Sequence, residues 1–233
     1  MAEPKDWISP ANLFLQTQVY RLGTNHGLCS LPLGPERDFL LLTWGPVIYR
    51  TTYAPDSQRL IPIFLRALNE EIRKALPRCL PGSPDQIRQL ERTYSSKVFS
   101  SQETYHGVDE IIIREAFHDW KISLALTSSD LPVRLRMCLL VDDGVLSFLT
   151  GMLDSSTLVE KEPDFSKCPV KVIEENFLAL NHVDSNSTEG KYLGWTTVTL
   201  SSLVEIYNGM QQGKCLADYH KEGRVYLGDN KWK

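Results

Sequence analysis

The sequence has no apolar stretch that approaches the roughly 18 residues a membrane-spanning helix needs. Its first ten residues, MAEPKDWISP, mix polar and charged side chains and lack the apolar centre of a secretion signal. Basic residues form no run, and the formal net charge of the 233 residues is −4. Nucleic-acid-binding proteins usually carry a basic face. We therefore expect a soluble, cytoplasmic protein that binds neither nucleic acid nor membrane.

Cysteine forms no pattern of a metal site or a disulfide framework. The count is odd, the spacings are wide and there is no CxxC pair. We expect free thiols in a reducing compartment and no bound metal. The five cysteines are Cys29, Cys79, Cys138, Cys168 and Cys215.

The motifs of the large enzyme classes are also missing. The sequence contains no GxSxG, P-loop, GxGxxG, HExxH or kinase signature, and Gly144 and Gly151 stand alone. An isolated glycine does not make a phosphate-binding loop. The sequence therefore predicts no cofactor.

Apolar residues, 42% of the chain, are sufficient for a sizeable core, and their patterns predict both helices and strands. Expected helices begin at Ser9-Pro10, Ser57, Ser83-Pro84, Asp109, Val145 and Ser201, and the first ends at Gly23. Expected strands cover 38–43, 47–53, 134–141, 170–174 and 195–200, with an edge strand at 224–227. In the helix after Asp109 the expected buried residues are Ile112, Ile113, Ala116, Phe117 and Trp120.

Strands and helices do not alternate regularly, and short connections favour antiparallel pairing. The predicted fold is α+β, with a mostly antiparallel, mixed sheet packed by helices in a single pair of layers. Ferredoxin-like elements are compatible with this pattern. We expect a packed N-terminal helix and loop at 1–37, a core domain at 38–213 and a tail at 214–233.

Several strand-to-helix junctions resemble those of a widespread group of uncharacterised fungal proteins of similar length. The resembling segments span about Gly45 to Tyr207 and read GPVIYRTTYAPDS, VDEIIIREAFHDW, MCLLVDDGVL, VKVIEENF and YLGWTTVTLSSLVEIY. The group has no agreed activity. The resemblance implies a fungal source and a single domain, and no particular chemistry.

Glu110, Arg114 and His118 recur every four residues and share one face of a helix. One interpretation makes His118 a general base oriented by the other two residues. The other makes the three a solvated outer face, which is the commoner arrangement. Glu174 and Glu175 are neighbours on a strand, so at most one of them points inward.

Asp142 and Asp143 end an apolar strand and begin a helix. They could bind a metal or share a proton, but capping of the helix is the simpler interpretation. Arg50 shares a strand face with Ile48 and Thr52, which predicts partial burial. Its charge then needs a carboxylate, with Asp142 the first candidate, or a ligand.

Two functions of different class remain open. The first is an interaction or ligand-binding module, with Arg50, Tyr53 and Trp195 as candidate ligand-binding residues. The second is a cofactor-independent enzyme of acid–base type, such as an isomerase, cyclase or hydratase of a biosynthetic pathway, with His118 and Asp142 as catalytic candidates. A small molecule, a protein partner and a second copy of the chain are all compatible with the sequence. An enzyme should gather these polar residues in one concave, apolar cavity.

Overall fold

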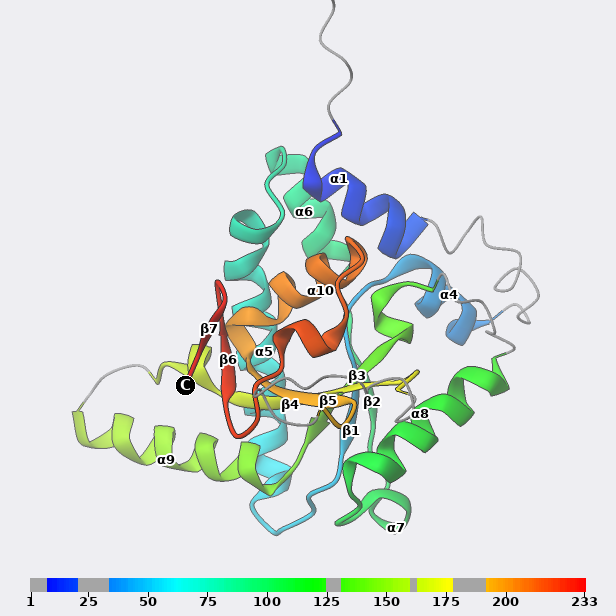
Figure 1. The fold of residues 1–233 in the computed structure, drawn as a ribbon. Helices are drawn as coiled ribbons and strands as arrows, with labels where there is room; N and C mark the ends of the chain where they lie inside the picture. The colour runs from blue at the N-terminus through cyan, green and yellow to red at the C-terminus, as the bar shows by residue number, and fades with distance from the viewer. Residues whose placement is uncertain (1–7, 21–33, 125–130, 160–162, 178–191) are drawn as a thin grey trace, which may run out of the picture.

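The computed structural model describes residues 8–20, 34–124, 131–159, 163–177 and 192–233 (Figure 1). Within these ranges the chain forms one seven-stranded mixed sheet packed by helices, so the predicted α+β class is confirmed. The strands are β1 Val47–Arg50, β2 Lys97–Phe99, β3 Met137–Val141, β4 Pro169–Glu174, β5 Trp195–Thr199, β6 Val225–Gly228 and β7 Lys231–Trp232.

The helices precede β1 and lie between the later strands. The α-helices are α1 Pro10–Leu15, α4 Pro35–Leu42, α5 Ser57–Cys79, α6 Pro84–Thr93, α7 Gln102–Tyr105, α8 Glu110–Ser123, α9 Asp143–Val159 and α10 Leu203–Gln211. A π-helix, η1 Gln16–Tyr20, continues α1. Short 3₁₀ turns are η2 Val133–Leu135, η3 Phe165–Lys167, η5 Leu200–Ser202 and η6 Leu216–Tyr219.

The strand order is β2-β1-β3-β4-β5-β6-β7. β1 runs parallel to both β2 and β3, and β5 runs parallel to β6, whereas the other neighbours are antiparallel. The antiparallel share is thus smaller than predicted. The reason is that α5 and α8 lie in the connections between the first three strands, and such crossovers return the chain in the same direction.

Helices pack on both faces of the sheet, which gives three layers rather than the expected single pair. All residues of β1 and β3 are buried, as is typical of strands covered on both sides. Ile48 and Leu139 face the large core formed with α5, α9 and α10. Val47 and Tyr49 face the opposite core, against Phe117 of α8.

The segment 38–43 was predicted to be a strand, and this is wrong. It belongs to α4, which has Pro35 in its first turn and Glu36 and Asp38 beside its N-terminus. Both features favour a helix start. Its apolar run spreads around the helix, because Leu40 is buried while Leu42 is 62% exposed.

Several predicted helix starts are confirmed by their caps. Ser9 accepts a hydrogen bond from the backbone N–H of Asn12, Ser83 and Gln86 form a capping box, and Asp109 accepts from two backbone N–H groups of α8. The predicted end of the first helix at Gly23 lies outside the described residues. α9 begins at Asp143, two residues before the predicted start, and the strand predicted from residue 134 begins only at Met137, after η2.

The face of α8 that meets the core is narrower than predicted. Ile113 and Phe117 are fully buried, and Ala116 and Trp120 are partly buried. Ile112 is 44% exposed, so its predicted burial is wrong. It follows Ile111 onto the outer side of the first turn, away from the sheet.

Residues 214–233 carry the last two strands of the sheet. β6 pairs with β5 and forms a hairpin with β7, so the predicted edge strand lies one position inside the edge. Tyr226 is fully buried and donates a hydrogen bond from its hydroxyl to Glu205 of α10, at 2.5 Å. Across the described ranges, no helix combines the length and the apolar character needed to cross a membrane.

Candidate functional site

Arg50 lies at the carboxyl end of β1 and is 6% exposed, so its predicted burial is found. Its Nε donates to the carbonyl oxygen of Thr52 at 2.9 Å, and its Nη2 donates to the Ser57 hydroxyl at 2.7 Å. The guanidinium carbon lies 4.3 Å from the centre of the Tyr53 ring. Oxygen dipoles and an aromatic face thus hold this cation, whereas a carboxylate was expected.

The proposed Arg50–Asp142 pair is wrong, and the register of the sheet explains why. Arg50 is the partner of Val141 in the parallel β1–β3 ladder. Successive side chains of a strand point to opposite faces, so Asp142 points away from the face that holds Arg50. Asp142 instead lies 3.0 Å from Lys171 and accepts a hydrogen bond from the backbone N–H of Val145.

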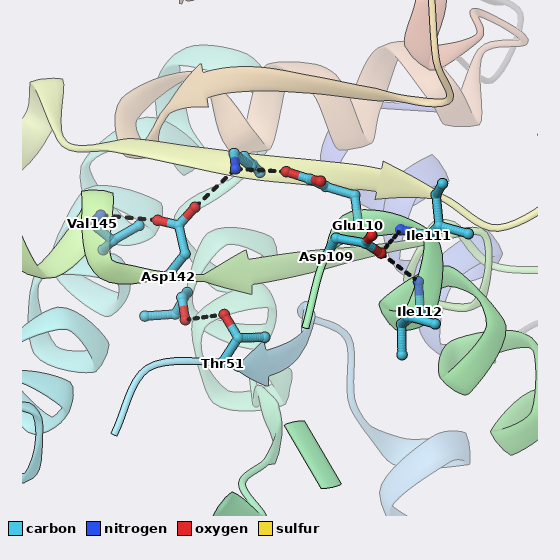
Figure 2. A network of polar contacts seen from close by, with 9 residues as sticks. Thr51, Asp109, Glu110, Ile111, Ile112, Asp142 and Val145 are labelled. Atoms are coloured by element: carbon cyan, nitrogen blue, oxygen red, sulfur yellow. Dashed lines mark hydrogen bonds and ion pairs between the residues drawn. The ribbon is translucent and has the colours of Figure 1, made fainter. Parts of the chain in front are cut away.

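Lys171 of β4 joins Glu110 and Asp142 in a polar network on the α8 face of the sheet, and Figure 2 shows these two carboxylates. Its Nζ lies 2.6 Å from Glu110 and 5.5 Å from the centre of the Trp195 ring. Burial alone would lower the pKa of Lys171, but its hydrogen bonds to Glu110 and Asp142 outweigh burial and raise the pKa. Asp142 thus caps α9, as the simpler interpretation predicted, and it also forms an ion pair with Lys171.

The stripe of Glu110, Arg114 and His118 lies along β4 and the residue that follows it. Glu110 and Arg114 are partly buried there and His118 is exposed, so the solvated-face interpretation holds only for His118. Glu110 pairs with Lys171, and Arg114 donates to the carbonyl oxygen of Glu174 at 3.0 Å. His118 lies 2.6 Å from Glu175. The four-residue spacing of α8 therefore matches polar groups along one strand.

Glu175 is the buried member of this arrangement, and its role was not predicted. Its side chain is fully buried, and its Oε1 lies 2.6 Å from His118 Nδ1 and 2.5 Å from Lys121 Nζ. Among the described residues its Oε2 has no hydrogen-bond partner. Because a carboxylate can only accept, His118 Nδ1 carries a proton, and the other ring nitrogen is free to accept one. Acid–base chemistry requires such an oriented imidazole.

The five candidates from the sequence occupy three separate places. Arg50 packs with Tyr53, Asp142 and Trp195 both flank Lys171, and His118 is held by Glu175. None of them lines either of the two hollows described below. The signal that was missed is Lys171, a cation at an inward position of an apolar strand.

The larger hollow lies between α9 and the β6–β7 end of the sheet, and we call it the α9–β6 groove. Its volume is about 990 Å³. Figure 1 shows α9 running out past the sheet on the side of β6 and β7. The lining residues come from six elements and their junctions, and they are Phe148, Met152, Asp164, Ser166, Lys167, Pro169, Thr199, Ser201, Val225, Leu227 and Lys233.

The alternation of β6 explains the apolar wall of this groove. Tyr226 points into the core, so its neighbours Val225 and Leu227 point to the opposite face and line the groove. Phe148 and Met152 lie one turn apart on α9 and form the facing wall. Leu227 is 38% exposed, which leaves apolar surface open to a ligand.

A second hollow, of about 460 Å³, lies where β1 and β3 lead into α5 and α9. Ser57 and Asp143 line it, and they bind Arg50 and Thr52 respectively. Both polar groups thus already serve the protein itself. In the described part of the chain, no group of three or more metal-ligating side chains could hold an ion.

Comparisons of the chain with protein-family models, with curated proteins and with solved structures gave no match.

Proposed function

We propose that the protein is a ligand-binding module that holds an apolar small molecule in the α9–β6 groove. The observation that supports this proposal is the size and lining of the groove. Its volume, about 990 Å³, is at the upper end of the roughly 300–1,000 Å³ typical of ligand sites. Such sites combine apolar walls with a few polar groups, as this groove does.

The walls are built on elements that are anchored to the rest of the fold. α9 is held by Val145, Leu146 and Leu149, which are buried in the large core. β6 is held by its ladder to β5 and by Tyr226. A ligand would therefore meet apolar side chains whose positions are set before it binds, which lowers the entropic cost of binding.

Binding of N-phenyl-1-naphthylamine, a neutral apolar fluorophore, tests the proposal. We expect saturable binding, with an affinity lowered about tenfold or more in a Met152→Gln, Leu227→Gln variant, because each side chain contributes apolar contact area. Ile112→Gln, which replaces an exposed apolar side chain outside the groove, is the matched control. Absence of saturable binding, or equal affinity in all three proteins, would refute the proposal.

The acid–base enzyme is a second candidate, and the contact between His118 and Glu175 supports it. The catalytic group would be His118, with its protonated Nδ1 held by Glu175. Nitrogen-15 NMR of the imidazole distinguishes the two tautomers. We expect the Nδ1–H form in the native protein and a mixture in Glu175→Gln. A native protein with the proton on Nε2 would remove the structural basis of this candidate.

Other expectations from the sequence stay predictions. They are the fungal source, the cytoplasmic location, the free thiols and the lack of nucleic-acid binding.

A further inference from the structure

We infer that the ligand of the α9–β6 groove is an elongated apolar acid whose anionic group binds Lys167 and Lys233. This inference rests on the proposed function and specifies the ligand class. Two lysines and one aspartate line the groove, so its ionisable side chains sum to +2 − 1 = +1. Within the described part of the chain, neither lysine forms an ion pair with a carboxylate.

Among the described residues that line the groove, Asp164 is the one with an acidic side chain, and its own turn engages it. Asp164 caps η3 and accepts a hydrogen bond from the backbone N–H of Ser166 at 3.0 Å. The hydrogen bonds from Ser166 are the main reason that the pKa of Asp164 is lowered. The Asp164 carboxylate is therefore held at the backbone of η3, and the two lysines give the side chains of the groove their positive balance.

Backbone hydrogen bonds fix the main chain at or next to both lysines. Lys233 exchanges two backbone hydrogen bonds with Val225, at 2.9 and 3.0 Å, which places it beside the β6 wall of the groove. Lys167 lies in η3. Asp164 caps this turn, and a hydrogen bond from the backbone N–H of Cys168 to the carbonyl oxygen of Phe165 closes it. A carboxylate of the ligand between these two cations would form charge-assisted hydrogen bonds.

The apolar walls determine the rest of the ligand. Phe148, Met152, Val225 and Leu227 offer only carbon and sulfur atoms from their side chains, so the part of the ligand that lies against these walls should be apolar. The occupant is thus a free molecule with an apolar body and one acidic end. A free acid fits this site better than a lipid headgroup in a membrane does, because the site is a hollow and a membrane surface is flat.

Dodecanoate and dodecanol form the matched pair of probes, because they share one alkyl chain and differ in charge. Each is titrated as a competitor of N-phenyl-1-naphthylamine below its micellar concentration, at low salt. We expect dodecanoate to bind at least about tenfold more tightly than dodecanol. Lys167→Gln with Lys233→Gln should lower the affinity for dodecanoate to that for dodecanol and leave dodecanol binding unchanged. Lys214→Gln, an exposed lysine outside the groove, should change neither.

The outcomes separate the inference from the proposed function. If neither the fluorophore nor the alkyl probes bind, the proposed function fails and the inference fails with it. If dodecanol binds as tightly as dodecanoate and the lysine substitutions change neither, the ligand is apolar but not acidic, and only the inference is overturned. Sedimentation with vesicles of anionic phospholipid should show no binding. Binding to vesicles without binding of free dodecanoate would also overturn it.

Discussion

Two buried charged side chains, Arg50 and Glu175, are stabilised in different ways. Arg50 is surrounded by a carbonyl oxygen, a hydroxyl and an aromatic ring, whereas Glu175 accepts from a lysine and a histidine. The apolar context of Arg50 in the sequence correctly predicted its burial. Its partner could not be predicted, because the face of Asp142 depends on the register between β1 and β3, and that register is set by residues far apart in the chain.

The substitutions Arg50→Met and Asp142→Asn should act independently. Arg50→Met removes two hydrogen bonds of a buried cation and should lower the free energy of unfolding by about 1.5–3 kcal/mol. Because the two side chains face opposite sides of the sheet, their effects should add within about 0.5 kcal/mol in urea denaturation. Arg50→Met with Ser57→Ala is the contrasting pair and should show coupling. Marked coupling between positions 50 and 142 would contradict the register argument.

Glu175 is expected to be the most sensitive carboxylate of the α8 face. Lys121→Met leaves the buried carboxylate with only the half-exposed His118, and the free energy of unfolding should fall by about 3–5 kcal/mol. Adding Glu175→Gln should recover part of the loss, because the stranded charge is removed. His118→Ala should cost less than Lys121→Met, since 47% of its side chain is in solvent. Equal costs for the two single variants would contradict this ranking, because His118 would then stabilise Glu175 as much as Lys121 does.

At the level of elements, sequence periodicity predicted which residues share a face but not what that face meets. The spacing of Glu110, Arg114 and His118 correctly placed them on one side of α8. That this side of α8 meets β4 depends on the strand order. β4 is the neighbour of β3 in the sheet, and Lys171 of β4 reaches Glu110 of α8. At 38–43 the type of element was predicted wrongly, because a short apolar run is equally compatible with a strand and a helix. The helix-favouring residues that precede it, Pro35 and Glu36, were the stronger signal.

The turn between β6 and β7 should control the stability of one wall of the groove. Asp229 and Asn230 both have positive φ, 51° and 56°, as in the type I′ turns that favour tight hairpins. Asn230→Val should lower the free energy of unfolding by about 1–2 kcal/mol, because a β-branched residue is strained there. Asn230→Gly should change it by less than about 0.5 kcal/mol. Lys231→Val, at the exposed next position, is the control for the added apolar surface. Thermal unfolding measures all three, and a loss in Lys231→Val as large as that in Asn230→Val would contradict the turn argument.

For the whole molecule, composition and junction motifs were sufficient to predict the α+β class. The three-layer arrangement was not predicted, because it depends on the long crossovers through α5 and α8. The α9–β6 groove could not be predicted from the sequence either. Its lining residues extend from Phe148 to Lys233, so no local pattern brings them together. The candidates from the sequence were chosen for their local context instead, and three separate places on the fold now hold them.

The cysteines report on the opening of the whole molecule, because their exposure differs widely. Cys215 is exposed, Cys79 is partly buried, and Cys138 and Cys168 are fully buried. Burial raises the pKa of Cys168 to about 12 and that of Cys138 further above its usual range. The thiolate is the reactive form, so these two thiols should react only after unfolding.

In native protein at pH 8, an aromatic disulfide reagent should modify Cys215 first and Cys79 more slowly. In a Cys29→Ser, Cys79→Ser, Cys215→Ser variant the two remaining thiols should react together, at a rate that rises with urea as global unfolding does. Denatured, unreduced wild type should yield about five equivalents, as expected for free thiols. A yield near three or one would reveal disulfides. Rapid native modification of Cys138 would show that the α8 face opens without the rest of the sheet, because Cys138 belongs to the core on that face.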